Sequence, residues 1–236
     1  MKVQLMLTCL CDAFYGEVGI AATKVLRACG CEVVFPENQT CCGQPPYNSG
    51  DWNAAREIAR KNRGAFDADI PIVTPSGSCA AMVREGYLQL FPDSAHIECY
   101  EVGEFLVREL GLESVSSSRG LAEHTKVAFH RACHGRGLGL KDEQERLLAT
   151  VPNVELVPFE QGEQCCGFGG AFSATHGSIS RGIGLEKLKH VMDSGAKTLA
   201  SGDMGCLMHL SGLVNREGIA LETKHYLEII AEGLPG

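Results

Sequence analysis

Cys41-Cys42-Gly43 and Cys165-Cys166-Gly167 repeat one triplet in the two halves of this 236-residue chain. Two adjacent cysteines followed by glycine are an uncommon pattern, so a matched pair indicates a duplicated unit. The triplets lie 124 positions apart, as do Cys9 and Cys133, and another cysteine follows each triplet. Eight of the twelve cysteines thus form two equivalent quartets, which are Cys9, Cys41, Cys42 and Cys79 in the first half and Cys133, Cys165, Cys166 and Cys206 in the second.

The composition is typical of a globular protein, with 44% hydrophobic and 21% charged residues. The net charge of −8 argues against nucleic acid or an anionic membrane as the main partner, because both attract basic surfaces. No apolar run reaches the ~18 residues that predict a transmembrane helix. Residues 1–7 favour a first strand over a signal peptide, so we expect a cytoplasmic protein. In that reducing compartment, clustered cysteines bind metal or carry out redox chemistry.

Apolar runs alternate with segments of helical periodicity in both halves. We expect strands at 2–8, 32–35, 70–73, 95–99, 126–130, 154–157 and 198–200, and helices at 16–28, 51–66, 79–90, 102–110, 141–150, 177–192, 206–215 and 225–232. Gln44-Pro45-Pro46 predicts extended or turning backbone, because a residue before proline avoids the helical region. The alternation is typical of parallel βαβ units. We therefore predict an α/β fold with two similar lobes, 1–113 and 124–236, related by a pseudo-twofold axis and joined by a polar linker at 114–123.

Four thiolates that converge on one point can hold an iron–sulfur cluster or a zinc ion, and the residue types alone do not distinguish the two. Each quartet draws its cysteines from three places: after the first strand, in the triplet loop, and near a helix start. Parallel strands bring their carboxyl ends to one edge of a sheet, so the cysteines are expected to gather there, between the lobes. The glycine of each triplet lets the backbone pass close to bulky inorganic sulfide.

Cys79 and Cys206 are expected in the first turn of their helices, where free N–H groups favour a thiolate. Ser76 and Asp203 lie three residues earlier, and both residue types are good N-caps. A role for Asp203 as a metal ligand or proton relay is an alternative to capping.

Other residues near the quartets leave further alternatives. Cys11 is a substitute for Cys9 as a ligand. His130 and His134 flank Cys133 and either could ligate metal or relay protons, although hydrogen bonding alone is the ordinary role. Residues 134–139, with Arg131, form either a turn before a helix or an anion pocket. Three cysteines without a counterpart in the other half are expected to be buried thiols, namely Cys29, Cys31 and Cys99.

The two quartets resemble the duplicated CCG, or cysteine-rich, domain. The patterns that carry this resemblance are Cys9…Cys41-Cys42-Gly43…Ser76-x-x-Cys79 and Cys133…Cys165-Cys166-Gly167…Asp203-x-x-Cys206. The domain occurs in heterodisulfide reductase and in the iron–sulfur subunits of glycolate oxidase and anaerobic glycerol-3-phosphate dehydrogenase. The length, the lack of an appended ferredoxin domain and the segments 43–45 and 202–206 are most similar to the lactate-utilisation protein A family.

The resemblance implies an iron–sulfur electron-transfer subunit, with up to one cluster, of the 4Fe–4S type, on the four cysteines of each lobe. It implies other iron–sulfur subunits as partners, in a complex that oxidises L-lactate to pyruvate. The reductase pattern has C-x-x-C where this chain has Ser76-x-x-Cys79 and Asp203-x-x-Cys206, which leaves four cysteines per site instead of five. The alternatives are a scaffold subunit, metal-free or with zinc in one lobe, and a thiol–disulfide enzyme of the heterodisulfide reductase type. No dinucleotide fingerprint or catalytic triad is evident, so no catalytic residue is assigned.

Overall fold

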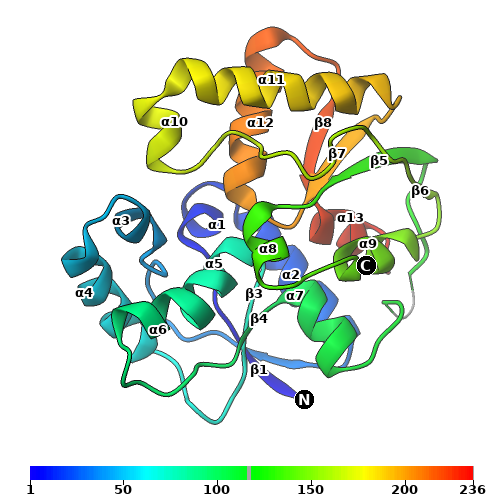
Figure 1. The fold of residues 1–236 in the computed structure, drawn as a ribbon. Coiled ribbons are helices and arrows are strands. Elements are labelled where there is room, and N and C mark those ends of the chain that lie inside the picture. The colour runs from blue at the N-terminus through cyan, green and yellow to red at the C-terminus, as the bar shows by residue number, and fades with distance from the viewer. Residues whose placement is uncertain (116–117, 236) are drawn as a thin grey trace.

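Two four-stranded sheets, each wholly parallel, organise the chain (Figure 1). The computed structural model describes residues 1–115 and 118–235. The strand order is β2-β1-β3-β4 in the first sheet and β6-β5-β7-β8 in the second, so the two sheets have the same topology. This confirms the predicted α/β class and the two similar lobes.

The first lobe is formed by the first half of the chain. Its described elements are β1 (Lys2–Leu5), α1 (Cys9–Phe14), α2 (Gly16–Ala28), β2 (Glu32–Val34), α3 (Gln44–Asn48), α4 (Trp52–Arg63), β3 (Ile72–Thr74), α5 (Gly77–Ala81), the π-helical segment η1 (Met82–Gly86), α6 (Tyr87–Leu90), β4 (Cys99–Glu101), α7 (Val102–Glu104) and the π-helical segment η2 (Phe105–Glu109).

The second lobe repeats this order. Its described elements are β5 (Thr125–His130), α8 (Cys133–Gly137), α9 (Glu143–Ala149), β6 (Val154–Leu156), α10 (Ala171–Thr175), α11 (Gly177–Asp193), β7 (Thr198–Ser201), α12 (Met204–Glu217), β8 (Glu222–His225) and α13 (Tyr226–Glu232). None of the helices among the described residues is long and apolar enough to cross a lipid bilayer.

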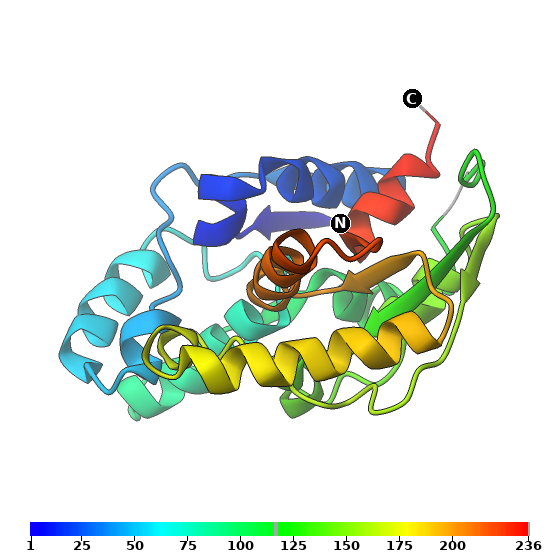
Figure 2. The same cartoon turned by 90° about the horizontal axis from the view of Figure 1, so that it is seen from above.

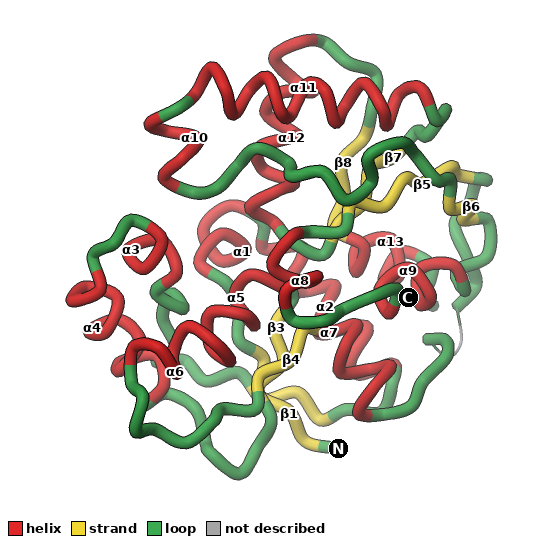
Figure 3. The backbone as a smooth tube through the Cα atoms, in the orientation of Figure 1, coloured by secondary structure: helices red, strands yellow, loops and turns green. Residues whose placement is uncertain are grey.

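The glycines of the two triplets establish which residues of the following helices are equivalent. Gly43 and Gly167 have φ values of +89° and +92°, a conformation that favours glycine. A side chain at Gly43 would meet the Ala55 carbonyl oxygen, and one at Gly167 would meet that of Ser180. The backbone of α4 and of α11 thus closes over the triplet in the same way. Each triplet lies in a long irregular connection, at 35–43 and 157–170 (Figure 3).

Helices from one lobe pack on the other in symmetric pairs. Helix α13 packs on α2, and its counterpart α7 packs on α9. Likewise, α12 contacts α1, and α5 contacts α8. Figure 2 shows α13 lying beside α2, although the two are separated by most of the sequence. This exchange of equivalent contacts is what a pseudo-twofold relation between the lobes requires.

One hydrophobic cluster joins the two lobes into a common core. Val115, which lies in the segment 114–123 predicted as a linker, is 4% exposed and belongs to this cluster. Residues 116–117 of the linker lie outside the described residues. Burying each large side chain contributes about 1.5–3 kcal/mol. The cluster includes Val3, Leu5, Leu26, Phe105 and Leu106 from the first lobe and Val127, Phe129, Leu147, Tyr226 and Ile230 from the second.

Several local predictions need correction. Residues 44–46 begin helix α3 instead of forming extended backbone, because prolines are tolerated in the first turn of a helix. The strand expected at 95–99 is β4, at Cys99–Glu101. Strand β8 was not predicted at all. Its sequence, Glu-Thr-Lys-His, is polar because the strand lies at the edge of the sheet and only His225 is buried.

Candidate metal centre

The two quartets share one layout, with a buried inner pair and a more exposed outer pair. The inner sulfurs of the first lobe, Cys42 Sγ and Cys79 Sγ, are 3.6 Å apart. Those of the second lobe, Cys166 Sγ and Cys206 Sγ, are 2.9 Å apart. All four are at most 8% exposed. In the outer pairs Cys41 is partly buried, and the exposed members are Cys9, Cys133 and Cys165.

All eight cysteines line a single cavity of about 500 Å³ between the lobes. Ser76, His134 and Asp203 line it as well, whereas Cys11 does not. Cys11 is fully buried and packs with Met204 and Leu207, in the contact between α1 and α12. The structure therefore brings together every cysteine of the two quartets and places the alternative Cys11 elsewhere.

Helix starts position the cysteines that follow the strands. Cys9 and Cys133 are the first residues of α1 and α8, directly after β1 and β5 and their short connections. The Ser76 hydroxyl accepts a hydrogen bond from the Cys79 amide at 3.2 Å, which fixes the first turn of α5. This confirms Ser76 as an N-cap and Cys79 as a first-turn residue.

The Asp203 carboxylate caps helices in both lobes. Its Oδ1 accepts from the Gly205 amide of its own helix, α12, at 3.1 Å. Its Oδ2 accepts from the Ser78 amide of α5 at 3.0 Å and from the Ser76 hydroxyl at 3.2 Å. The predicted N-cap role is confirmed, and it extends to the helix of the other lobe. With both oxygens engaged, capping accounts for this residue.

Hydrogen bonds among the thiols favour one thiolate in each quartet. Bonds from Cys42 and Cys9 lower the pKa of Cys41 to about 3. In the second lobe a bond from Cys206 lowers the pKa of Cys166 to about 4. Thiolates are the form that ligates metal, so both sites are electrostatically ready for a cation.

In the second lobe, but not at the aligned position of the first, a histidine ring contacts an outer cysteine and favours its thiolate form. His134 Nδ1 lies 3.8 Å from Cys133 Sγ. This hydrogen bond lowers the pKa of Cys133 and raises that of His134. The residue aligned with His134 in the first lobe, Leu10, has no titratable group. His134, which was considered because it is next to Cys133 in the sequence, therefore contacts a cysteine of the site and favours its thiolate form.

Residues 3–84 and 127–211 each match the cysteine-rich domain, CCG. The chain belongs to this family. Each matched segment holds one complete quartet, which confirms the duplication and the resemblance stated from the sequence.

Full-length relatives of this CCG protein are close in sequence. Lactate utilization protein A 2 of Bacillus cereus (strain Q1) is 41% identical, over 99% of each chain. Lactate utilization protein A of Geobacillus kaustophilus (strain HTA426) is 44% identical, over 98% of each chain. Among solved structures, a hypothetical protein from Helicobacter pylori matches with a TM-score of 0.56 at 11% identity. That match covers all of this chain and 49% of the other, and it shows the fold alone.

The CCG repeats differ in the side chains just behind their inner cysteines. His130 and Lys187 lie there in the second lobe, 1% and 0% exposed. Met6 occupies the place of His130 in the first lobe, 124 positions earlier, and Asn62 occupies that of Lys187, as the offset between α4 and α11 requires. Both first-lobe residues are neutral and 1% exposed. Groups able to carry positive charge thus stand behind one quartet only.

Lys187 is a buried residue of the site that was not predicted from the sequence. Its Nζ donates to the carbonyl oxygens of Gln161 and Gly162, each at 3.3 Å, and lies 5.1 Å from the centre of the Phe159 ring. It thereby holds the loop that leads to the second triplet. Burial lowers its pKa to about 8. The helical periodicity that places Lys187 on the buried face of α11, with Leu188 and Val191, was the signal that could have found it.

Residues 134–137 of the segment considered as a turn or an anion pocket lie in the short helix α8, and 138–139 form the turn after it. Arg131 donates to the Glu145 carboxylate at 2.6 Å, and Arg136 donates to the Glu163 carbonyl oxygen at 2.7 Å. Both guanidinium groups therefore have acidic or carbonyl partners within this CCG protein.

Three cysteines have no counterpart in the other half. Cys31 and Cys99 are buried as expected, whereas Cys29 is only partly buried.

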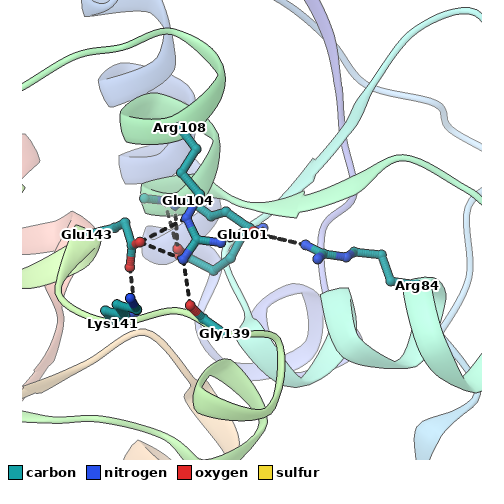
Figure 4. Close-up of polar contacts among 8 residues, drawn as sticks. Arg84, Glu101, Glu104, Arg108, Gly139, Lys141 and Glu143 are labelled. Carbon is teal, nitrogen blue, oxygen red and sulfur yellow. Dashed lines mark hydrogen bonds and ion pairs between the residues drawn. The ribbon is translucent and has the colours of Figure 1, made fainter.

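An ion-pair network links the two lobes (Figure 4). Arg108 of the first lobe donates to Glu143 Oε1 of the second through Nη2 at 2.6 Å and Nε at 2.8 Å. The Arg108 guanidinium also donates to the Gly139 carbonyl oxygen at 2.6 Å. The other Glu143 oxygen accepts from the Lys141 amide at 2.7 Å. This set of contacts fixes the connection between α8 and α9 against the first lobe.

The network continues into the first lobe through two buried carboxylates. Glu104 accepts from Arg84 Nη1 at 2.8 and 2.9 Å and completes a capping box with Glu101, the N-cap of α7. Glu101 is fully buried and accepts from the Tyr226 hydroxyl of the second lobe at 2.7 Å. Burial raises the pKa of Glu101 to about 7. The equivalent N-cap of α13 is His225, which contacts the Pro75 carbonyl oxygen across the lobes at 3.2 Å.

Proposed function

We propose that the protein is an electron-transfer subunit whose eight quartet cysteines hold two iron–sulfur clusters, one per lobe. The observation that carries this proposal is the single cavity lined by both quartets. Centres that face one cavity are close enough in space to exchange electrons. A bound cluster supplies one-electron redox chemistry, and the protein sets its position and its potential.

The donor set fits such a group. Each quartet combines two buried and two more exposed sulfurs. In each quartet one cysteine is favoured as a thiolate, Cys41 in the first lobe and Cys166 in the second. The glycine of each triplet lets the backbone of the following helix pack closely against the triplet. All twelve cysteines are free, which supports a reducing, cytoplasmic location.

The names of the relatives support a role in lactate utilisation. Oxidation of L-lactate to pyruvate releases two electrons and two protons. We propose that a partner subunit holds the substrate and that the electrons pass one at a time through the clusters of this chain to iron–sulfur centres of a further partner. In this scheme the chain is a subunit of an oxidoreductase that does not itself carry the substrate site.

Metal analysis of the protein purified without oxygen tests the proposal. Iron and acid-labile sulfide should approach the content of two 4Fe–4S clusters per chain. Cys41→Ser and Cys165→Ser should each remove about half of both, since each breaks one quartet. Cys99→Ser is the matched control, because this thiol is fully buried and does not line the cavity. Absence of iron and sulfide from the anaerobic protein contradicts the proposal.

Stoichiometric zinc without sulfide would instead favour a scaffold subunit. The specific observation for that alternative is the close group formed by His130, Cys166 and Cys206, because imidazole and thiolate together suit zinc. Turnover of a small disulfide with a reductant by the isolated anaerobic protein would favour the thiol–disulfide enzyme. The vicinal cysteines, with one thiolate favoured in each lobe, are the observation behind that assay.

A further inference from the structure

His130 is a buried imidazole without a hydrogen-bond partner. It is the last residue of β5 and is 1% exposed, and neither Nδ1 nor Nε2 meets the geometry of a hydrogen bond to a described residue, while the Cys166 thiol lies close enough to interact with the ring. Buried polar atoms are nearly always paired, because leaving them unpaired is unfavourable. A buried nitrogen in this state needs an explanation, and a ligand absent from the structure provides one.

The nearest chemistry to this imidazole is a pair of thiols. One ring nitrogen of His130 and the sulfurs of Cys166 and Cys206 all lie within 4.8 Å of one another. No other group of three metal-binding side chains is as close within residues 1–115 and 118–235. Donors on one tetrahedral metal lie about 3.4–3.8 Å apart, as bond lengths of about 2.0–2.3 Å require. Only small side-chain movements separate this group from a coordination shell.

The first lobe provides the contrast. Met6, at the equivalent position, has a partner for its sulfur, because Asn62 Nδ2 approaches it at 3.6 Å. Asn62 itself donates to the Tyr87 hydroxyl at 3.1 Å and accepts from the Thr40 amide at 3.0 Å. The polar groups behind the first quartet are therefore satisfied by the protein itself, whereas His130 behind the second is not.

We infer that His130 is a ligand of the metal centre in the second lobe, where it binds together with Cys166 and Cys206. The centre of the second lobe is then a mixed imidazole–thiolate site, and that of the first lobe is bound by thiolates alone. If the imidazole takes the place of one of the four thiolates, it brings less negative charge to the centre, and the second centre then has the higher reduction potential. Electrons shared between the lobes would then rest on the second.

Cobalt provides a probe that does not depend on cluster assembly. Co²⁺ is titrated into the metal-free protein carrying Cys41→Ser, Cys42→Ser and Cys79→Ser, which leave the first quartet a single thiol, and X-ray absorption at the cobalt edge identifies the ligand atoms. We expect a shell with one nitrogen besides sulfur. Adding His130→Met, the residue found in the first lobe, should remove the nitrogen and weaken Co²⁺ binding at least about tenfold. Met6→Leu is the matched control and should change neither.

A shell of sulfur alone in the chain with His130 intact would overturn the assignment, and so would unchanged binding after His130→Met. The first of these measurements needs no substitution at His130, so it stands even if His130→Met unfolds. The inference rests on the proposed function only for the potential. If cobalt has a nitrogen ligand but the protein binds no iron or sulfide after anaerobic reconstitution, the electron-transfer proposal is wrong and the assignment of His130 as a ligand stands. If the protein binds clusters but cobalt has only sulfur ligands, the electron-transfer proposal stands and the assignment of His130 is wrong.

Discussion

The two lobes agree in their backbone and differ in the charges behind their sulfurs. Strand order, triplet glycines, helix caps and the positions of all eight cysteines are shared. Behind the inner cysteines, however, the second lobe has His130 and Lys187 where the first has Met6 and Asn62. The fold thus specifies where sulfur is delivered, while a few buried neighbours decide how each site behaves electrically.

The same contrast recurs at the N-caps that meet across the lobes. Glu101 caps α7 and His225 caps α13, at equivalent positions of the repeat and in the same capping-box arrangement. Burial acts on the two in opposite directions. It raises the pKa of Glu101 to about 7 and lowers that of His225 to about 4. One shared geometry therefore carries an acid in one lobe and a base in the other.

The largest expected effect comes from breaking the contact that locks the lobes together. Arg108→Met leaves the carboxylate of Glu143, which is 6% exposed, without its cation and should destabilise the protein by about 2–4 kcal/mol. Chemical denaturation of the metal-free protein measures this. Arg181→Met removes the exposed pair with Glu217 and, as the control, should change stability by less than about 1 kcal/mol. Equal effects from the two substitutions would rule out a special role for the network.

The paired N-caps predict opposite pH responses. Because the folded-state pKa of Glu101 lies above the ordinary 4.5, its contribution is present at low pH and is lost as pH rises from about 4.5 to 7. The depressed pKa of His225 gives a contribution that is present above about pH 6.5 and is lost as pH falls to about 4. In the native protein the two trends oppose each other.

Substitutions separate these trends. Glu101→Gln should make stability rise with pH relative to the native protein between pH 4.5 and 7, at up to about 1.4 kcal/mol per pH unit. His225→Asn should make it fall with pH, relative to the native protein, between pH 4 and 6.5. Urea denaturation of the metal-free proteins across this range gives both differences. Parallel curves for native and variant proteins would show that neither group titrates abnormally.

The smallest effect distinguishes the caps of the two sulfur-bearing helices. Ser76→Ala removes the cap of α5 and should cost about 1 kcal/mol. Asp203→Ala removes contacts to both α5 and α12 and should cost about 2 kcal/mol. The comparison uses thermal or urea unfolding under identical conditions. A cost for Asp203→Ala no greater than that of Ser76→Ala would show that the contact across the lobes contributes nothing.

Repetition made much of the fold predictable. The offset of 124 residues, applied to short apolar strands and capped helices, was enough to predict two parallel lobes with their cysteines gathered between them. Ser76 and Asp203 were identified as caps because their residue types and their spacing to Cys79 and Cys206 are local features. Capping depends on residues within one turn of the helix start, so it can be predicted from a short stretch of sequence.

What escaped prediction depends on contacts between distant segments. Strand β8 is polar because its sheet edge meets solvent, so it lacks the apolar signal of a strand. The pairing of Arg108 with Glu143 and the double capping by Asp203 exist only once the lobes have met. Helical periodicity places Lys187 on the buried face of α11, but the two loop carbonyls that it satisfies belong to a segment about 25 residues away, so its role could not be read locally.

The negative charge of the Asp203 carboxylate offsets the partial positive charges at the amino ends of two helices. The amino end of a helix carries roughly half a positive charge, so the ends of α5 and α12 together present about one. Asp203 contacts both ends and supplies one negative charge to match them. Either half of the duplication taken alone would leave a fractional charge beside its cysteines. Electrically, the repeated unit is therefore the pair of lobes and not the single lobe.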